Sequence, residues 1–106
     1  MSGSSAGGGG FDAPPGNCED LVIETQLSSP KEEVVDSIRV GNILAVATHT
    51  KGGTTVVVVL HKGKVAGGLA SPLVQRLREC INTGTQYQAK VLAKNDGQVR
   101  VRVTAV

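Results

Sequence analysis

Aromatic residues are almost absent from this chain of 106 residues, which has no Trp, one Tyr and one Phe. Phe11 lies in a segment of Gly, Ser and Pro with almost nothing to bury, so Tyr87 is the aromatic residue left for the foldable part. The core must therefore be built from Val, Leu, Ile and Ala. Valine occurs mostly in alternating or continuous short runs, which favours strands over helices.

Long apolar runs are also missing. No stretch reaches the roughly 20 apolar residues that span a bilayer, and the N-terminus lacks a basic region followed by an apolar run. We therefore expect a cytoplasmic protein with no membrane partner. Cys18 and Cys80 are too few for a disulfide framework. Because cytosolic disulfides are rare, we expect Cys80 to be a buried thiol, with a Cys18–Cys80 bridge as the less favoured alternative.

Residues for catalysis or metal binding are scarce. His49 and His61 are the two histidines, and neither has a Cys or acidic partner at ligand spacing. We interpret both as solvated side chains near a strand end and at a turn. The glycine-rich residues 63–68 match neither a phosphate-binding loop nor a dinucleotide fingerprint. We therefore expect no cofactor, no metal ion and no enzymatic activity.

The chain divides into two parts by composition. Residues 1–16 are rich in Gly, Ser and Pro and are predicted to form a disordered tail or linker. Residues 17–106 contain the apolar periodicity and are predicted to form a single β-rich domain.

The strongest local signal is the β-branched run at residues 54–60, followed by a turn, a second strand and a helix. Ser29 and Ser71 each precede a Pro and are predicted to cap short helices. The fold class that we predict is mainly β (α+β): a small, closed or partly open barrel of about six short strands with one capping helix, because closure hides valine-rich edges. An open α+β sheet with the helix on one face is the alternative. The predicted strands are residues 21–27, 43–50, 54–60, 65–69, 86–94 and 99–103, with a helix or ordered loop after Ser29 and a helix at residues 72–82.

Three features follow one another in the second half. Gly67-Gly68-Leu69 ends a strand, residues 73–81 carry spaced leucines, and residues 84–91 read G-T-Q-Y-Q-A-K-V. In this order they resemble the later part of the HIRAN domains, with their G-x-x-Y/F-x-A-x-V stretch. The region from Cys18 onward also resembles small bacterial proteins of similar length. The HIRAN resemblance implies a compact β-barrel that binds DNA ends, often beside helicase modules, and it assigns no binding residue in this chain.

Charge is distributed unevenly along the foldable part. Residues 17–44 hold six acidic and two basic residues, whereas residues 45–106 hold nine basic and two acidic residues. Such asymmetry is typical of an anion-binding surface, and equally of two halves that neutralise each other after folding. An exposed cluster of Glu32, Glu33 and Asp36 would favour a protein partner.

The basic residues are the feature from which we predict function. The alternation of residues 99–103 places Arg100 and Arg102 on one outward face, and the same reasoning places Lys90 and Lys94 on the outward face of the neighbouring strand. Clustered positive charge attracts phosphates whatever the base sequence. The sequence therefore predicts a non-catalytic binding module for DNA or RNA, with a protein-interaction or scaffold domain as the alternative. The candidate nucleic-acid-binding residues are Lys90, Lys94, Arg100, Arg102, Lys62 and Lys64.

Overall fold

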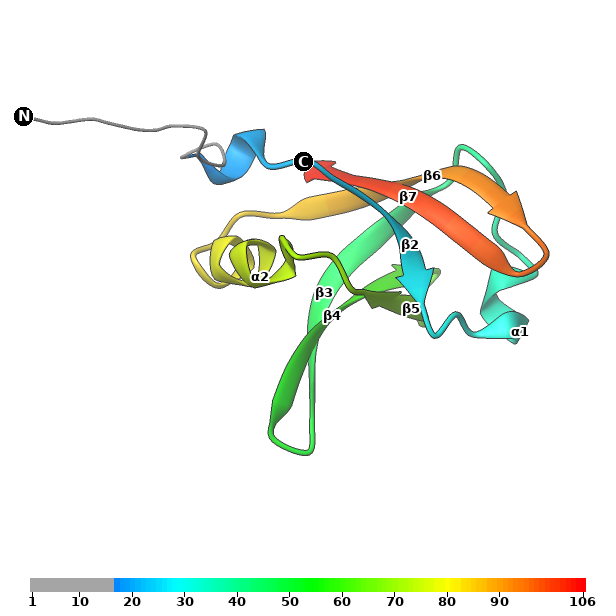
Figure 1. Cartoon of the computed structure of the whole chain (residues 1–106), viewed down its shortest axis with the longest axis horizontal. Coiled ribbons are helices and arrows are strands. Elements are labelled where there is room, and N and C mark those ends of the chain that lie inside the picture. The colour runs from blue at the N-terminus through cyan, green and yellow to red at the C-terminus, as the bar shows by residue number, and fades with distance from the viewer. Residues whose placement is uncertain (1–16) are drawn as a thin grey trace, which may run out of the picture.

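The structure is a computed structural model that describes residues 17–106. Six antiparallel strands close into a barrel in the order β2-β5-β4-β3-β6-β7, and one main helix accompanies them (Figure 1). The predicted fold class is therefore confirmed, whereas the tail predicted at residues 1–16 lies outside the described residues. The elements are η1 (Cys18–Asp20), β2 (Ile23–Ser28), α1 (Glu32–Val35), β3 (Ile43–Lys51), β4 (Thr54–His61), β5 (Lys64–Leu69), α2 (Val74–Asn82), β6 (Tyr87–Asn95) and β7 (Gln98–Ala105).

Strand β7 shows most clearly why this sequence forms a barrel. Val99, Val101 and Val103 are at most 1% exposed, whereas Arg100 and Arg102 are exposed. Successive side chains of a strand point to opposite faces, so the valines fill the barrel and the arginines face solvent. The predicted alternation in this strand is confirmed.

The two helices lie at opposite ends of the barrel (Figure 1). The short helix α1 connects the end of β2 to the start of β3 and buries Val35, and Ile38 in the loop behind it is also fully buried. At the other end, α2 connects β5 to β6 and buries Leu77 and Cys80. Apolar side chains from both helices therefore join the strand residues in one core.

The helix starts differ from the predicted caps. Ser29 takes a left-handed backbone conformation with φ of 49°, and α1 begins after Lys31 with no side-chain cap. The chain must reverse sharply as it leaves β2, and the N–H of Lys31 then donates to the carbonyl of Ala66 (2.8 Å), so Ser29 is used in the turn. Ser71 does bind a backbone N–H, that of Leu73 (3.1 Å), but α2 begins at Val74 and not at Pro72.

Cys18 and Cys80 form a disulfide, which corrects the expected buried thiol. Their Cα atoms are 5.5 Å apart across a sequence separation of 62 residues. The bridge fastens η1 to the buried face of α2. The hydroxyl of Tyr87 donates to the carbonyl of Cys18 (2.6 Å) and holds the same segment from β6.

One hairpin extends beyond the barrel (Figure 1). Strand β3 pairs with β6 only at residues 43–45, and β4 pairs with β5 only at residues 58–61. Residues 46–51 of β3 and 54–57 of β4 have each other as their only strand partners within residues 17–106. We call this part, residues 46–57, the projecting hairpin.

Candidate nucleic-acid interface

The six lysines and arginines named as candidate nucleic-acid-binding residues lie in three separate places. Strand register decides where each of them falls. Lys90, Arg100 and Arg102 share the outer face of β6 and β7, Lys94 lies toward the barrel end covered by α1, and Lys62 and Lys64 flank the turn between β4 and β5.

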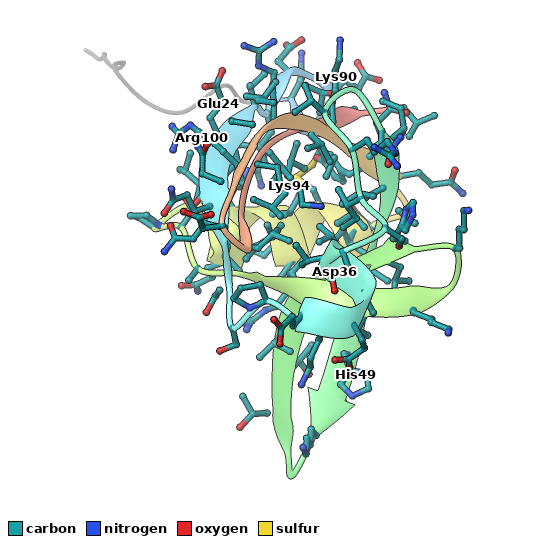
Figure 2. The ribbon with its side chains drawn as sticks, turned by 90° about the vertical axis from the view of Figure 1, so that its right-hand side faces the viewer. Glu24, Asp36, His49, Lys90, Lys94 and Arg100 are labelled. Atoms are coloured by element: carbon teal, nitrogen blue, oxygen red, sulfur yellow. A yellow bond between two sulfur atoms is a disulfide. The ribbon has the colours of Figure 1, made fainter. Side chains whose placement is uncertain are left out.

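We call the outer face that carries Lys90, Arg100 and Arg102 the basic wall. Lys90 of β6 lies directly opposite Arg102 of β7, and Arg102 lies directly opposite Glu24 of β2. Arg100 precedes Arg102 by two residues and lies on the same face of β7. Two residues span about 6–7 Å along a strand. Figure 2 shows Lys90 and Arg100 on the outside of the barrel. The predicted grouping of these three cations is therefore present in the fold.

Acidic side chains neutralise only part of the positive charge on the basic wall. Like charges directly opposite each other on neighbouring strands are destabilising, and Lys90 and Arg102 form such a pair. Glu24 offsets one of the three positive charges, because its Oε2 lies 2.8 Å from Nε of Arg102. Both side chains of this ion pair are more than one third exposed, so solvent screens it and it contributes less than about 1 kcal/mol. An excess of positive charge remains on the wall.

Lys94 does not belong to the basic wall, which corrects the prediction. A β-bulge between Val91 and Ala93 shifts the register, so that Lys94 lies opposite the buried Val99. Its ammonium group donates to the carbonyl of Ile38 (3.0 Å), and Asp36 supplies a second carbonyl at 3.4 Å. Figure 2 shows Lys94 and Asp36 together at this barrel end. The prediction assumed unbroken alternation, and one extra residue in the bulge exchanges the two faces.

Lys62 and Lys64 lie on the opposite side of the barrel from the basic wall. They flank the turn that joins β4 to β5, and Lys62 has a positive φ of 53°. In the closed order of six strands, β4 is three positions from β7 in either direction. These two lysines therefore lie apart from the wall and do not add to its cluster of charge.

The acidic residues of the first half gather away from the basic wall. Glu32, Glu33 and Asp36 are exposed on and after α1, which covers one end of the barrel. Glu24 is the acid that the fold pairs with a wall arginine. The cluster thus stays exposed, the condition under which the sequence favours a protein partner, and it leaves the wall positive.

Two residues that sequence reasoning missed lie beside the basic wall. The N–H of Gly41 donates to the carbonyl of Val91 (2.8 Å), so the loop that carries the exposed Arg39 runs next to β6. Ile43 lies directly opposite Lys90 and is 53% exposed. Arg39 lies within the acidic half of the sequence, which gave no reason to group it with the basic residues. The position of Ile43 opposite Lys90 depends on strand pairing, which the sequence does not show.

Tyr87 is not available for stacking on a base. Its side chain is 5% exposed, and its hydroxyl donates a hydrogen bond to the carbonyl of Cys18. Burial raises the pKa of Tyr87, and the positive charge of Arg76 opposes part of that rise. Residues 17–106 contain no second aromatic side chain, so the basic wall offers charge and aliphatic surface only.

The two histidines differ in their exposure to solvent. His49 is exposed, as predicted, whereas Nε2 of His61 is buried with no hydrogen-bond partner in the described part of the chain, which corrects its interpretation as a solvated residue. No group of three His, Cys, Asp or Glu side chains that could hold a metal ion occurs within residues 17–106. None of the helices described is long and apolar enough to cross a membrane.

Comparisons with protein-family models, with curated proteins and with solved structures find no match for this chain. The HIRAN resemblance therefore stays a prediction, and the functional argument depends on the geometry of the described residues.

Proposed function

We propose that this domain is a non-catalytic module that binds nucleic-acid backbones, with little sequence preference, on the basic wall. The observation that supports the proposal is the grouping of Lys90, Arg100 and Arg102 on neighbouring strands. Phosphate groups would relieve the repulsion between Lys90 and Arg102, because an anion placed between them attracts both. Binding and fold stability would then be coupled.

The chemistry of the wall supports backbone contacts more than base readout. Long basic side chains reach phosphate oxygens without entering a groove, and such contacts carry no sequence information. Base-specific single-strand binding uses aromatic platforms, and the buried Tyr87 cannot serve as one. We therefore expect affinity no better than micromolar, in the range of non-specific binding. DNA and RNA are both candidate partners.

The cellular location remains a proposal as well. From the sequence we expect the cytoplasm, but the Cys18–Cys80 disulfide favours an oxidising compartment, since cytosolic thiols are kept reduced. In the cytoplasm the two cysteines would be thiols, and the segment η1 would be held by Tyr87 and core packing. Mass spectrometry after rapid alkylation of cells would distinguish the two states.

Titration of short single- and double-stranded oligonucleotides at several salt concentrations tests the proposal. Two or three phosphate contacts predict that affinity falls with salt at a log–log slope of about −2 to −3. The variant Lys90→Gln/Arg100→Gln removes two of the wall cations and should weaken binding about tenfold at low salt. Neither residue has an ion pair that the change would break within residues 17–106.

Two further variants make the test specific. Lys62→Gln/Lys64→Gln removes the same charge from the opposite side of the barrel and should leave affinity within about twofold. Glu24→Gln releases Arg102 from its ion pair and should strengthen binding and steepen the salt slope. Equal losses of affinity in these two double variants of lysine and arginine residues, or no binding at low salt, would refute a binding site on the wall.

A protein-interaction role, the alternative left open by the sequence, is favoured by a separate observation. The projecting hairpin exposes strand edges on the side of the barrel opposite the basic wall. This surface leads to the inference below.

A further inference from the structure

A groove of about 460 Å³ lies between the projecting hairpin and the β2 and β5 side of the barrel. It is distinct from the basic wall, since β4 and β7 lie across the barrel from each other. Its floor is mainly apolar and comes from β4 and β5. The residues that line it are Ser28, Ser29, Lys31, His49, Lys51, Val56, Val57, Val58, Val65, Gly67, Gly68 and Leu69.

The groove runs along an open strand edge. Residues 54–57 of β4 pair with β3 on one side, and their other side has no strand partner among the described residues. One backbone group in this segment is already bound, because the carbonyl of Thr55 accepts a hydrogen bond from Nη1 of Arg78 (3.0 Å). The edge is about 13 Å long at a rise of about 3.3 Å per residue. Val56 on this edge is 42% exposed. Exposed edges of this kind pair with extended segments of other chains.

Two glycines line the base of the groove and have no side chains to fill it. A Cβ on Gly68 would meet only the carbonyl oxygens of Val57 (3.6 Å) and Ser28 (3.8 Å) within 4 Å, which are ordinary contacts. Gly67 is different, because a Cβ there would lie 3.1 Å from Cβ of Leu27. A side chain at Gly67 would therefore displace Leu27 slightly, whereas the space above Gly68 is open and adjoins the free edge of β4.

The charge of the groove has one sign. Lys31 and Lys51 line it together with His49, and no Asp or Glu side chain does. Figure 2 shows His49 on the projecting hairpin, below the barrel. A second copy of this chain would present the same positive residues on its own hairpin edge, so like charges oppose pairing between two hairpins. An occupant with negative charge and a backbone able to pair with a strand fits better.

We propose that the groove binds an extended acidic segment of a partner protein, which adds as a strand to the free edge of β4. Its alternate apolar side chains contact Val56 and the aliphatic floor, and its carboxylates face Lys31 and Lys51. A nucleic acid lacks the regularly spaced amide N–H and carbonyl groups that a strand edge requires. The site is independent of the basic wall, so failure of one proposal leaves the other standing.

The probe is a capped peptide of about eight residues that alternates Val and Glu, a usual strand length. Binding is measured by titration, and the hydrogen exchange of the amides of residues 54–57 is measured with and without peptide. We expect slower exchange of those edge amides that do not bond to β3. Lys31→Gln/Lys51→Gln should weaken binding about 5–10-fold, whereas Lys62→Gln/Lys64→Gln should change it less than about twofold.

Gly68→Val tests the steric part of the proposal. Its side chain would stand beside the carbonyl of Val57 and should abolish peptide binding, while the contacts available to its Cβ allow the fold. Gly68→Ala, with a smaller side chain, should bind with intermediate affinity. Equal binding of a Val–Lys peptide, protection confined to other strands, or the same protection at high protein concentration without peptide would each overturn the acidic-segment proposal.

Discussion

The basic wall and the projecting hairpin lie on opposite sides of one barrel and use the same kind of strand differently. On the wall, β7 pairs with β2 at residues 100–103 on one side and with β6 on the other, so the backbone that carries Arg100 and Arg102 has strand partners on both sides. In the projecting hairpin, residues 54–57 have a strand partner on one side only within the described chain. The wall can offer a ligand only side chains, whereas the hairpin can also offer backbone.

This difference also separates rigidity from adaptability. Residues that alternate into a closed barrel are packed on every side, and their neighbours cannot relax easily. The hairpin joins the rest of the fold at its base, where Val57 is buried in the core, and through the guanidinium of Arg78, whose Nη1 donates to the carbonyl of Thr55 (3.0 Å). We therefore expect substitutions of buried barrel residues to affect stability, and substitutions of exposed residues on the wall or the hairpin to affect binding.

The largest effect on the free energy of unfolding should come from removing the disulfide, which fastens η1 to α2 at one end of the barrel. The variant Cys18→Ala/Cys80→Ala opens a loop of 62 residues, and the chain-entropy estimate for such a loop is about 4 kcal/mol of unfolding free energy. Urea denaturation of the variant and of the oxidised parent would measure it. The parent with reducing agent is the control and should lose a similar amount; an unchanged midpoint on reduction would contradict the role of the bridge.

A matched pair of valines gives the next largest effect. Val101→Ala, at a fully buried site in the barrel, should cost about 2 kcal/mol, because it leaves a cavity that the packed strands cannot close. Val56→Ala, at a 42% exposed site in the projecting hairpin, should cost less than about 0.5 kcal/mol. The same denaturation measurement serves both variants, and equal costs would remove the distinction between barrel and hairpin.

Tyr87→Phe should cost about 1 kcal/mol, between the costs of the two valine substitutions, from loss of the hydrogen bond to the carbonyl of Cys18. The effect should depend on pH. Because the pKa of Tyr87 is raised in the folded state, its contribution is complete below the unfolded pKa of 10.0 and is lost as pH rises through the folded pKa. Stability of the parent should therefore fall more steeply above pH 10.0 than that of Tyr87→Phe. Parallel curves would show that the hydroxyl is not held as described.

Regular alternation was the most predictable feature of this chain. The buried valines of β7, the apolar face of α2 and the closure of the barrel follow from local periodicity and from the need to hide edges. Lys94 could not be placed in this way, because the bulge after Val91 inserts one residue and exchanges the two faces beyond it. Periodicity carries no information about where a bulge occurs.

Long-range contacts account for the remaining differences. The Cys18–Cys80 bridge and the buried Nε2 of His61 depend on which elements meet in the closed barrel. The open edge beside Gly68 depends on how short the pairing between β4 and β5 is. These are consequences of register between strands, which composition and spacing do not specify.

Mapping amide chemical-shift changes by NMR, with an oligonucleotide and with the Val–Glu peptide in separate titrations, tests the central claim most directly. The account predicts that the oligonucleotide shifts resonances around Lys90, Arg100 and Arg102, and that the peptide shifts those of residues 54–57 and Gly68. Each ligand should bind with unchanged affinity when the other is present. Overlapping shift maps, or competition between the two ligands, would contradict the assignment of separate binding surfaces to the wall and the hairpin.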